Sequence, residues 1–297
     1  MEPAIEVLNV TKTFGDFRAL DDFSLTVDRG SIHGFLGPNG SGKSTTIRTL
    51  LGVLAPSSGT VRILGVAPDR EPSVLKRVGY VPGDVSLWPT LTGAETLRAL
   101  ESLRSVPTDR KREDELIDAF NLDPTKKTRD YSTGNRRKVS LIAALSFGAD
   151  FLLLDEPTAG LDPLMESVFV DEVRKEHSNG ATVLLSSHIL SEVEKLCDYV
   201  TVIKSGHVVE RGTIRQLRHL STHSVSANVS RETADAFRRE LGDSAVVVDK
   251  LGRTTLTVER DKVPDTLRTL LDANATDIET QPASLEEIFM RHYETGE

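Results

Sequence analysis

Apolar and polar residues alternate along the first segments of the chain. Residues 5–10 and 25–27 carry apolar side chains at every second or third position, and Gly15 and Asp16 between them favour a turn. This pattern predicts short strands of an antiparallel meander. Residues 32–36 come next, as a candidate buried strand that runs directly into a glycine-rich segment.

A helical spacing of apolar residues begins after that glycine-rich segment. The apolar positions there recur every three or four residues, at Ile47, Leu50, Leu51 and Leu54. Thr92 and Glu95 have the sequence of a capping box, which predicts the start of a second helix. Further helices are expected over residues 110–120 and around residues 165–176.

Two continuous apolar runs, residues 150–155 and 181–186, lie on either side of that last helix. Runs of this kind are typical of parallel strands that are covered on both faces. Residues 200–203 and 207–210 flank a turn at 204–206 and predict a hairpin. The alternation of strands and helices therefore predicts an α/β fold with a parallel central sheet.

The pattern changes after Gly212, and the polar residues 220–226 mark an expected boundary. Beyond it a β-α-β-β-α-β-α order is predicted, with a strand over 225–229, a helix over 233–241, strands over 245–248 and 254–258, a helix over 263–271, a strand near Ile278 and a helix over 284–293. We therefore expect a large domain over residues 1–220 and a small α+β domain over residues 221–297.

The charge of the chain argues against a nucleic-acid partner. Its 297 residues carry a formal net charge of -9, with 38% hydrophobic and 27% charged residues, which is the composition of an ordinary globular protein. Residues 221–297 alone hold nine Lys and Arg against fifteen Asp and Glu. A basic surface of the kind that a phosphate backbone requires is therefore not expected.

Cysteine usage and the N-terminal segment favour the cell interior. Cys197 is the one cysteine, so an internal disulfide is excluded, and a small buried apolar side chain is expected there. The first ten residues have no basic region followed by an apolar stretch, so no signal peptide is expected. A membrane span takes about 20 mostly apolar residues, and the uncharged stretch 139–149 is shorter. Any role at a membrane is therefore expected at its surface.

The glycine-rich segment has the pattern G-x-x-x-x-G-K-[ST] between a predicted strand and a predicted helix, which is the context of a phosphate-binding loop. Backbone N–H groups of such a loop face the phosphates of a nucleotide, and the helix directs its positive end at them. Lys43 is expected to reach the β- and γ-phosphates, and the Ser44 hydroxyl to coordinate Mg²⁺. The residues expected to bind nucleotide here are Gly37, Pro38, Asn39, Gly40, Ser41, Gly42, Lys43, Ser44 and Thr45.

Residues 151–157, FLLLDEP, form an apolar run that ends in two carboxylates. The run resembles the Walker B segment of ABC-family ATPases, and residues 158–162, TAGLD, look like the D-loop of that family. The resemblance implies that Asp155 binds the magnesium ion and that Glu156 activates the attacking water. Glu156 and Lys43 are therefore expected to be catalytic.

Residues 186–188, Ser-Ser-His, resemble the switch segment of the same family, whose histidine contacts the γ-phosphate, so His188 is expected to be catalytic too. Residues 131–135, YSTGN, occupy the place of the family signature LSGGQ and match it at Ser132 and Gly134. In that family the signature completes the ATP site of the opposite subunit. One loop and one signature per chain therefore imply a homodimer or a pair with a second ATPase subunit.

Two further positions concern the bound ATP and its metal ion. Phe14 resembles the aromatic residue that stacks on adenine, with Phe17 as the alternative and a core role open for either. The family places a glutamine, a magnesium ligand, after residues 80–82, whereas this chain has Gly83. Asp84 is one candidate to replace that ligand, and the other is that water completes the metal shell.

The family resemblance covers residues 4 to about 215 and implies a P-loop NTPase core with an antiparallel β-subdomain and an inserted helical subdomain. The remaining extension, ending in SLEEIF at 284–289, looks like that of ATPases from drug and antibiotic exporters with separate membrane subunits. What this implies is an ATP- and Mg²⁺-dependent ATPase at the cytoplasmic face of the membrane. It would drive export of a drug-like or lipid-like substrate through separate permease chains.

Other classes remain open. An importer ATPase would share every catalytic residue, and Gly83 with the altered signature also fits a nucleotide sensor with little hydrolysis. An ABC ATPase that acts on DNA carries a long coiled-coil insertion, and one that acts on the ribosome usually carries two cassettes. The sequence has neither.

Overall fold

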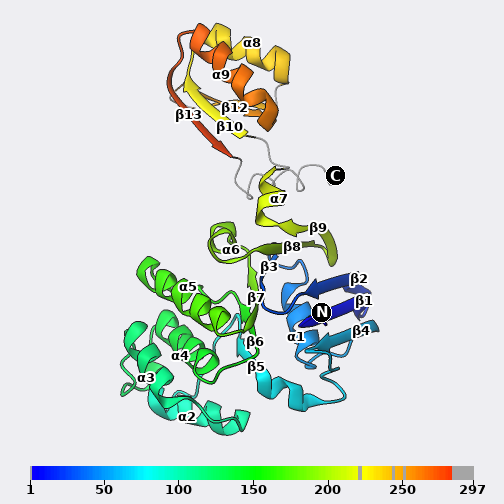
Figure 1. Ribbon diagram of the computed structural model, residues 1–297, viewed down its shortest axis with the longest axis vertical. Coiled ribbons are helices and arrows are strands. Elements are labelled where there is room, and N and C mark those ends of the chain that lie inside the picture. Colours follow the sequence, from blue (N-terminus) through cyan, green and yellow to red (C-terminus); the bar gives the residue numbers. More distant parts are fainter. Residues whose placement is uncertain (1, 220–222, 243–244, 250–251, 283–297) are drawn as a thin grey trace. The chain divides into compact units, whose positions relative to one another are not determined.

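Figure 1 shows the computed structural model of the chain, which describes residues 2–219, 223–242, 245–249 and 252–282. The chain divides into two compact units, Met1–Arg211 and Gly212–Glu297. The domain limits 1–220 and 221–297 stay a prediction, and the helix expected over 284–293 lies outside the described residues. In the described part of the chain, no helix is both long enough and apolar enough to cross a membrane.

A six-stranded sheet forms the centre of the first unit (Figure 1). Its order is β5-β6-β7-β3-β8-β9, with strands Val78–Val81, Phe151–Asp155, Thr182–Ser187, Ile32–Leu36, Tyr199–Lys204 and His207–Thr213. Neighbouring strands from β5 to β8 are parallel. Every residue of β3, β6 and β7 is buried, which explains their largely apolar sequences. The predicted parallel central sheet is therefore confirmed.

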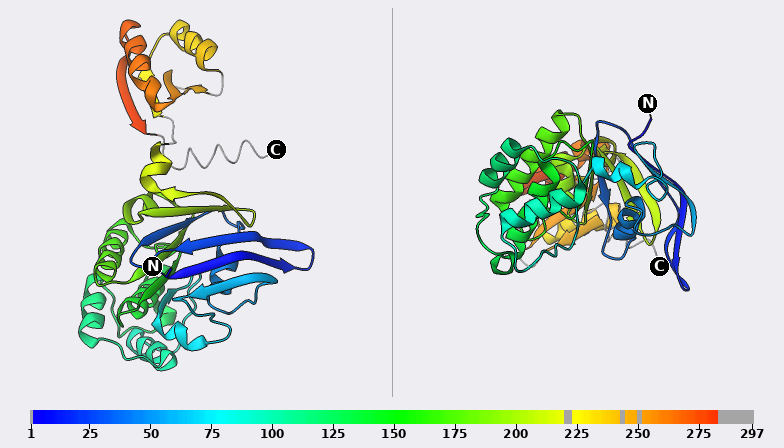
Figure 2. Two further views of the ribbon diagram at one scale, coloured as in Figure 1. Left: turned by 45° about the vertical axis from the view of Figure 1, so that its right-hand side comes forward. Right: turned by 90° about the horizontal axis from the view of Figure 1, so that it is seen from below.

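A second sheet of the first unit is antiparallel, with the order β2-β1-β4, and its long strands are clear in Figure 2. Strands β1 (Ile5–Phe14) and β2 (Phe17–Val27) form a hairpin, and β4 (Ser58–Ile63) pairs with the other edge of β1. The predicted meander of short strands is thus wrong in its connectivity, because the third strand follows a helix. The sequence pattern did not reveal β4, since only Ile63 of its residues is buried.

Helix α1 (Lys43–Leu50) lies between the two sheets of the first unit (Figure 1). It contacts β2 and β4 of the antiparallel sheet and β6 of the central sheet, and Ile47 and Leu50 are fully buried. The helix ends before Leu54, the last position of the predicted pattern, because Gly52 adopts the left-handed conformation at φ 68°. Packing on both sides holds the first turn of α1 at the end of β3.

Helices α2 (Gly93–Arg104), α3 (Arg110–Ala119) and α4 (Thr133–Leu145) form the helical part of the first unit (Figure 1). Helix α4 contacts α2, α3 and β5, so it joins this part to the central sheet. The predicted capping box is confirmed, because Thr92 and Glu95 accept a hydrogen bond from each other's backbone N–H group. Helix α5 (Pro163–Ser178) follows β6, and α6 (Leu190–Leu196) follows β7.

The second unit contains a four-stranded antiparallel sheet in the order β11-β12-β10-β13. Its elements are α7 (Ile214–His219), β10 (His223–Asn228), α8 (Arg231–Leu241), β11 (Val246–Val248), β12 (Arg253–Val258), α9 (Val263–Asp272) and β13 (Thr276–Pro282). Strand β10 begins inside the stretch 220–226 that was expected to be a boundary. Val225 and Leu256 pack with Phe237 of α8 and Leu270 of α9, so both helices cover one face of the sheet. The β-α-β-β-α-β order is that of ferredoxin-like domains.

His33, in the second position of β3, is expected to make the first unit sensitive to mild acid. Its ring is buried, with Nε2 2.9 Å from Thr201 Oγ1. Burial lowers the pKa of His33 from 6.5 to about 4, and Asp28 opposes part of that shift. Between pH ~6.5 and pH ~4, His33 is therefore protonated in the unfolded chain and neutral in the folded chain. The free energy of unfolding should fall by about 2 kcal/mol between pH ~7.5 and pH ~5 for this reason.

Denaturant titrations of the wild type and of His33→Gln at the two pH values measure that loss. Glutamine still offers a hydrogen bond to Thr201 but does not titrate, so the variant should lose about 2 kcal/mol less than the wild type on acidification. An equal loss in both proteins would show that His33 does not govern the acid sensitivity.

Candidate functional site

The loop of residues 37–42 connects β3 to α1. Gly40 and Gly42 have φ angles of 80° and 112°, which glycine adopts freely and other residues rarely do. A Cβ atom on Gly37 would lie 2.4 Å from the backbone oxygen of Ile203 in β8, so only glycine allows the loop to approach that strand. The glycines of the predicted phosphate-binding pattern are thus required by the backbone conformation and by close packing.

Lys43, the first residue of α1, folds its side chain over this loop. Its Nζ atom donates hydrogen bonds to Gly37 O at 2.6 Å and Pro38 O at 3.0 Å, and the residue is 5% exposed. Burial lowers the pKa of Lys43, while Glu156 and Asp155 oppose that shift. A charged phosphate oxygen is a stronger hydrogen-bond acceptor for an ammonium group than a carbonyl oxygen is. Lys43 can therefore exchange its two carbonyl acceptors for the oxygens of a bound phosphate.

Glu156 and His188 meet just beyond the ends of β6 and β7, as the two parallel strands bring their following loops together. His188 Nδ1 lies 3.0 Å from Glu156 Oε1, and the two side chains are 44% and 26% exposed. Glu156 has a left-handed backbone with φ 46°, a conformation that costs a non-glycine residue about 1–3 kcal/mol and needs support from its surroundings. The structure thus pairs two residues that the sequence predicted to be catalytic.

Asp155, the last residue of β6, is 6% exposed. Burial raises its pKa, and the neighbouring Glu156 raises it further, so this carboxylate gains from a nearby positive charge. Gly83 lies directly against it, since a Cβ atom on Gly83 would be 3.1 Å from Asp155 Oδ2. Asp84, the proposed substitute ligand, is exposed on the same loop.

The oxygen donors near the phosphate-binding loop suit Mg²⁺. In proteins that ion commonly keeps several waters and takes one or two carboxylates together with substrate phosphates. The buried carboxylate of Asp155 and the exposed hydroxyl of Ser44, in the first turn of α1, are donors of this kind. Within the described residues there is no cluster of three or more His, Cys, Asp or Glu side chains that would hold a metal ion alone. The donors therefore fit a magnesium ion that arrives with a nucleotide.

Arg137 of α4 fixes the loop that carries Gly83. Its guanidinium donates to Pro82 O and, at 2.5 Å, to Gly83 O, and the residue is 3% exposed. Burial lowers the pKa of Arg137, and the charge of Asp155 opposes that shift most strongly. Arg137, which is 54 residues after Gly83 in the sequence, thus joins α4 to the loop beside Asp155. Sequence analysis missed this role, because its only signal was the basic run 136–138.

Ser132 and Gly134 lie at the start of α4. Ser132 is the N-cap and its Oγ accepts a hydrogen bond from Asn135 N–H at 3.2 Å. A Cβ atom on Gly134 would lie 2.5 Å from Gly160 O, so the segment 158–162 packs directly on this helix end. Among the described hydrogen bonds, none joins either residue to the phosphate-binding loop of the same chain. The N–H groups of such a helix end attract anions.

Phe14 and Phe17 face each other at the tip of the hairpin of β1 and β2. They are 47% and 63% exposed, so the open possibility that either is a core residue is wrong. The Nζ atom of Lys12 lies 5.1 Å from the ring centre of Phe14. An exposed ring beside a cation is suited to stack on a flat, electron-rich group.

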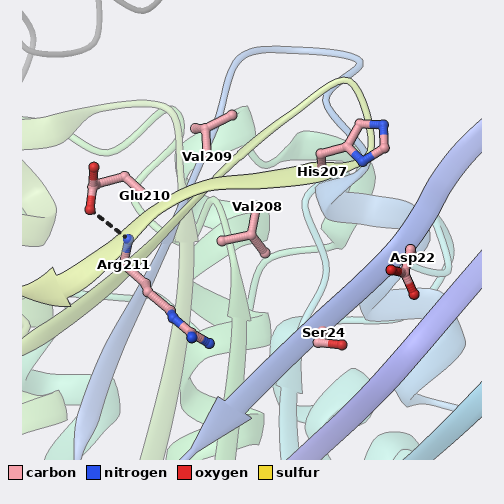
Figure 3. A pocket seen from close by; sticks show the side chains of 7 residues that line it. All are labelled: Asp22, Ser24, His207, Val208, Val209, Glu210 and Arg211. Atoms are coloured by element: carbon pink, nitrogen blue, oxygen red, sulfur yellow. Dashed lines mark hydrogen bonds between the residues drawn. The ribbon is translucent and has the colours of Figure 1, made fainter.

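A hollow of about 430 Å³ opens between β2 and β9 (Figure 3). Its lining residues are Asp22, Ser24, His207, Val208, Val209, Glu210 and Arg211. None of them is a residue that the sequence predicted to bind nucleotide or metal. The Asp22 carboxylate already accepts a hydrogen bond from Asn9 Nδ2 at 2.9 Å. This hollow is therefore separate from the candidate site.

A phosphate-binding loop beside a buried carboxylate and a Glu–His pair, all at one end of a parallel sheet, defines a P-loop ATPase. The family model described as ABC transporter matches residues 20–159. The daunorubicin resistance ATP-binding protein DrrA3 of Streptomyces coeruleorubidus is 36% identical over 93% of this chain and 84% of its own length. The Nod factor export ATP-binding protein I of Ralstonia nicotianae is 33% identical over 97% of this chain and 93% of its own.

Two solved structures share the fold. The ATP-binding subunit of an ABC transporter superposes with a TM-score of 0.68 at 29% identity, over 72% of this chain and 92% of that one. A dimeric bacterial ABC transporter cassette superposes with a TM-score of 0.64 at 26% identity, over 71% of this chain and 99% of that one. This chain therefore belongs to the ABC transporter family, as an ATPase related to those of drug, antibiotic and Nod factor exporters.

Proposed function

We propose that this chain is the ATP-hydrolysing subunit of an exporter that moves a drug-like or lipid-like substrate through separate permease chains. The observation that carries the proposal is the extent of its similarity to ATP-binding proteins named for drug resistance and for Nod factor export. Those relatives align with 93% and 97% of this chain, so the alignment reaches well into the second unit. The chain acts from the cytoplasmic face of the membrane as a peripheral subunit.

The phosphate-binding loop holds the phosphates of ATP, with Lys43 on the β- and γ-phosphates and Thr45 on the α-phosphate. Phe14 stacks on the adenine ring, and its exposure of 47% supports that role. Ser44 and Asp155 hold Mg²⁺, which supplies positive charge to the phosphate oxygens when it is bound. The low dielectric around Asp155, visible in its raised pKa, strengthens its attraction for a cation.

Glu156 accepts the proton of the attacking water, and His188 holds the Glu156 carboxylate in place through its Nδ1 atom at 3.0 Å. A general base must lie within hydrogen-bond reach of the water, so the direction of this carboxylate decides the rate. His188 also contacts the γ-phosphate, which couples the presence of ATP to the position of the base. The partial exposure of both side chains supports access of water and phosphate.

A second subunit completes the ATP site through its own Ser132 and Gly134. In this chain Gly134 packs against Gly160 of its own D-loop, segment 158–162, and Ser132 caps α4, whose first N–H groups are suited to a γ-phosphate. A solved cassette with the same fold is dimeric. The active form is therefore a homodimer or a pair with a second ATPase subunit. ATP binding closes it, and hydrolysis reopens it.

Asp84→Ala is expected to raise the Mg²⁺ concentration for half-maximal ATP hydrolysis by about 10-fold, the lower end of the loss that follows removal of a group that orients a metal site. The reason is proximity, because Gly83 lies against Asp155 and Asp84 is the next residue. A magnesium titration of steady-state hydrolysis measures the effect, with Ser86→Ala on the same loop as the control. An unchanged titration would mean that water completes the metal shell.

The transport proposal is tested in the source cells. A strain that lacks the chain should become more sensitive to amphiphilic antibiotics, and wild-type chain but not Glu156→Gln should restore resistance. A tagged chain should also copurify with a protein that has about six apolar spans of ~20 residues. Unchanged sensitivity together with a solute uptake defect would favour an importer, and the absence of any membrane partner would contradict transport altogether.

A further inference from the structure

The carboxylate of Glu192 bridges the D-loop and the end of β7 in the candidate site. Glu192 lies in the first turn of α6. Thr158 Oγ1 donates a hydrogen bond to its Oε1 atom, and Ser187 Oγ donates one to its Oε2 atom at 2.7 Å. Thr158 and Ser187 are 5% and 1% exposed, so both hydroxyl groups depend on protein partners.

The two bridged residues directly adjoin the proposed catalytic pair. Thr158 is two residues after Glu156, and Ser187 immediately precedes His188. Ser187 Oγ also accepts a hydrogen bond from Ile189 N–H at 2.9 Å, so the same hydroxyl supports the chain on both sides of His188. The bridge therefore restrains the loops from which Glu156 and His188 project.

The backbone of Glu156 is held by its N–H group, which donates a hydrogen bond to Ser186 O at 2.9 Å, but the Glu156 and His188 side chains are less restrained. Both side chains are partly exposed, and Glu156 holds a left-handed backbone that persists only where its surroundings enforce it. A carboxylate that accepts two hydroxyl hydrogen bonds forms strong, charge-assisted contacts with defined direction. Removal of Glu192 would leave the buried Thr158 hydroxyl without its acceptor. The Ser187 hydroxyl would keep only the Ile189 carbonyl as an acceptor, at 3.1 Å, so nothing would then join it to Thr158 and the two segments could move apart.

We propose that Glu192 is a positioning residue for ATP hydrolysis, which sets the distance between the Glu156 carboxylate and the His188 ring by tying the D-loop to the switch segment. This inference rests on the proposed roles of Glu156 and His188. It goes beyond them, because the described hydrogen bonds of the Glu192 side chain go to Thr158 and Ser187 and none goes to Glu156 or His188. Nothing in the local sequence indicates the link, since Glu192 and Thr158 are 34 residues apart.

The bridge borders an open hollow, which makes its removal testable. A space of about 310 Å³ between α5 and α6 is lined in part by Thr158, Glu166 and Glu192. Truncation of Glu192 therefore enlarges a space that is already open, and no sealed void forms in the core. The folded state should survive the change, since sealed cavities account for much of the usual loss of stability.

The test compares Glu192→Ala and Glu192→Gln with the wild type, with Glu166→Ala as a control that removes another carboxylate from the same hollow. Steady-state hydrolysis and the binding of a fluorescent ATP analogue are measured for each. Glu192→Ala should lower kcat by about 10–100-fold, as expected for a displaced catalytic group, and leave analogue binding within about 2-fold of the wild type. Glu192→Gln has the length to reach both loops and should recover part of kcat.

A second measurement separates positioning from general support of the fold. In the His188→Ala background there is no His188 ring left to position, so Glu192→Ala should lower single-turnover hydrolysis by less than about 3-fold further. An undiminished loss there, or a loss of analogue binding equal to the loss of kcat, would overturn the proposal. Glu156→Gln is measured in parallel. If Glu156→Gln stays active, the proposed role of Glu156 as general base is wrong. If Glu156→Gln is inactive but Glu192→Ala stays active, the role of Glu156 stands and the positioning role of Glu192 is wrong.

Discussion

Glu156→Gln is expected to lower ATP turnover by about 10²–10⁴-fold while ATP binding is retained. The amide has the shape of the carboxylate and can still accept the contact from His188 Nδ1, which is 3.0 Å long in the wild type. It cannot accept the proton of the attacking water. Phosphate release in the steady state measures turnover, and a fluorescent ATP analogue measures binding.

The same variant should make the ATP-bound dimer visible, because a pair of subunits that closes on ATP and cannot hydrolyse it has no route to reopen. Size-exclusion chromatography with and without ATP and Mg²⁺ shows whether Glu156→Gln shifts to twice the monomer mass. Glu166→Gln, in the first turn of α5, is the matched control and should behave as the wild type. A wild type as inactive as Glu156→Gln would favour the nucleotide sensor.

Gly134→Ala is expected to lower ATP turnover by about 10²-fold, the size of effect that follows a shift of about 1 Å at a catalytic group. The new Cβ atom would lie 2.5 Å from the backbone oxygen of Gly160, so the D-loop or the start of α4 has to move. In a free helix alanine would be favoured over glycine by about 1 kcal/mol. A loss of activity therefore reports the displaced contact and not a poorer helix.

Binding of a fluorescent ATP analogue to the monomer should be unaffected by Gly134→Ala, because no described hydrogen bond joins residue 134 to the phosphate-binding loop of its own chain. Gly212→Ala is the control, since the nearest atom to its Cβ position is the end of the Gln216 side chain at 3.3 Å. ATP-driven dimerisation should fail in the first variant and persist in the second. Normal turnover in Gly134→Ala would contradict a role of this helix end in completing the site.

The elements that carry the site were predictable from local patterns. Three strands of the central sheet are buried throughout their lengths, at residues 32–36, 151–155 and 182–187. Strands covered on both faces need mostly apolar residues, so their sequences are easy to recognise. The capping box at Thr92 was equally readable, because both of its hydrogen bonds lie within four residues. Strand β4 was not predictable, since its single buried residue leaves no alternation in the sequence.

Some differences were small and local. The helix after the phosphate-binding loop ends at Leu50 because Gly52 adopts a left-handed backbone, although the apolar spacing continues to Leu54. Periodicity alone carries no information on where a chain leaves the helix, whereas backbone conformation does. Phe14 and Phe17 are likewise of a residue type that commonly fills cores, and they are exposed because they lie at the tip of the hairpin of β1 and β2.

The sequence by itself determined the chemistry of this protein: a phosphate-binding loop, two carboxylates after an apolar strand and a histidine after the next one. These motifs are short, and their order and spacing are enough to predict an ATPase. Only the tertiary structure decided what holds those groups in place. Arg137 donates a hydrogen bond to Gly83 O, and Gly134 leaves space for the backbone of Gly160. Glu192 accepts hydrogen bonds from Thr158 and Ser187. Most of these contacts join residues some tens of positions apart, so they depend on how helices pack beside the sheet, which no local pattern encodes.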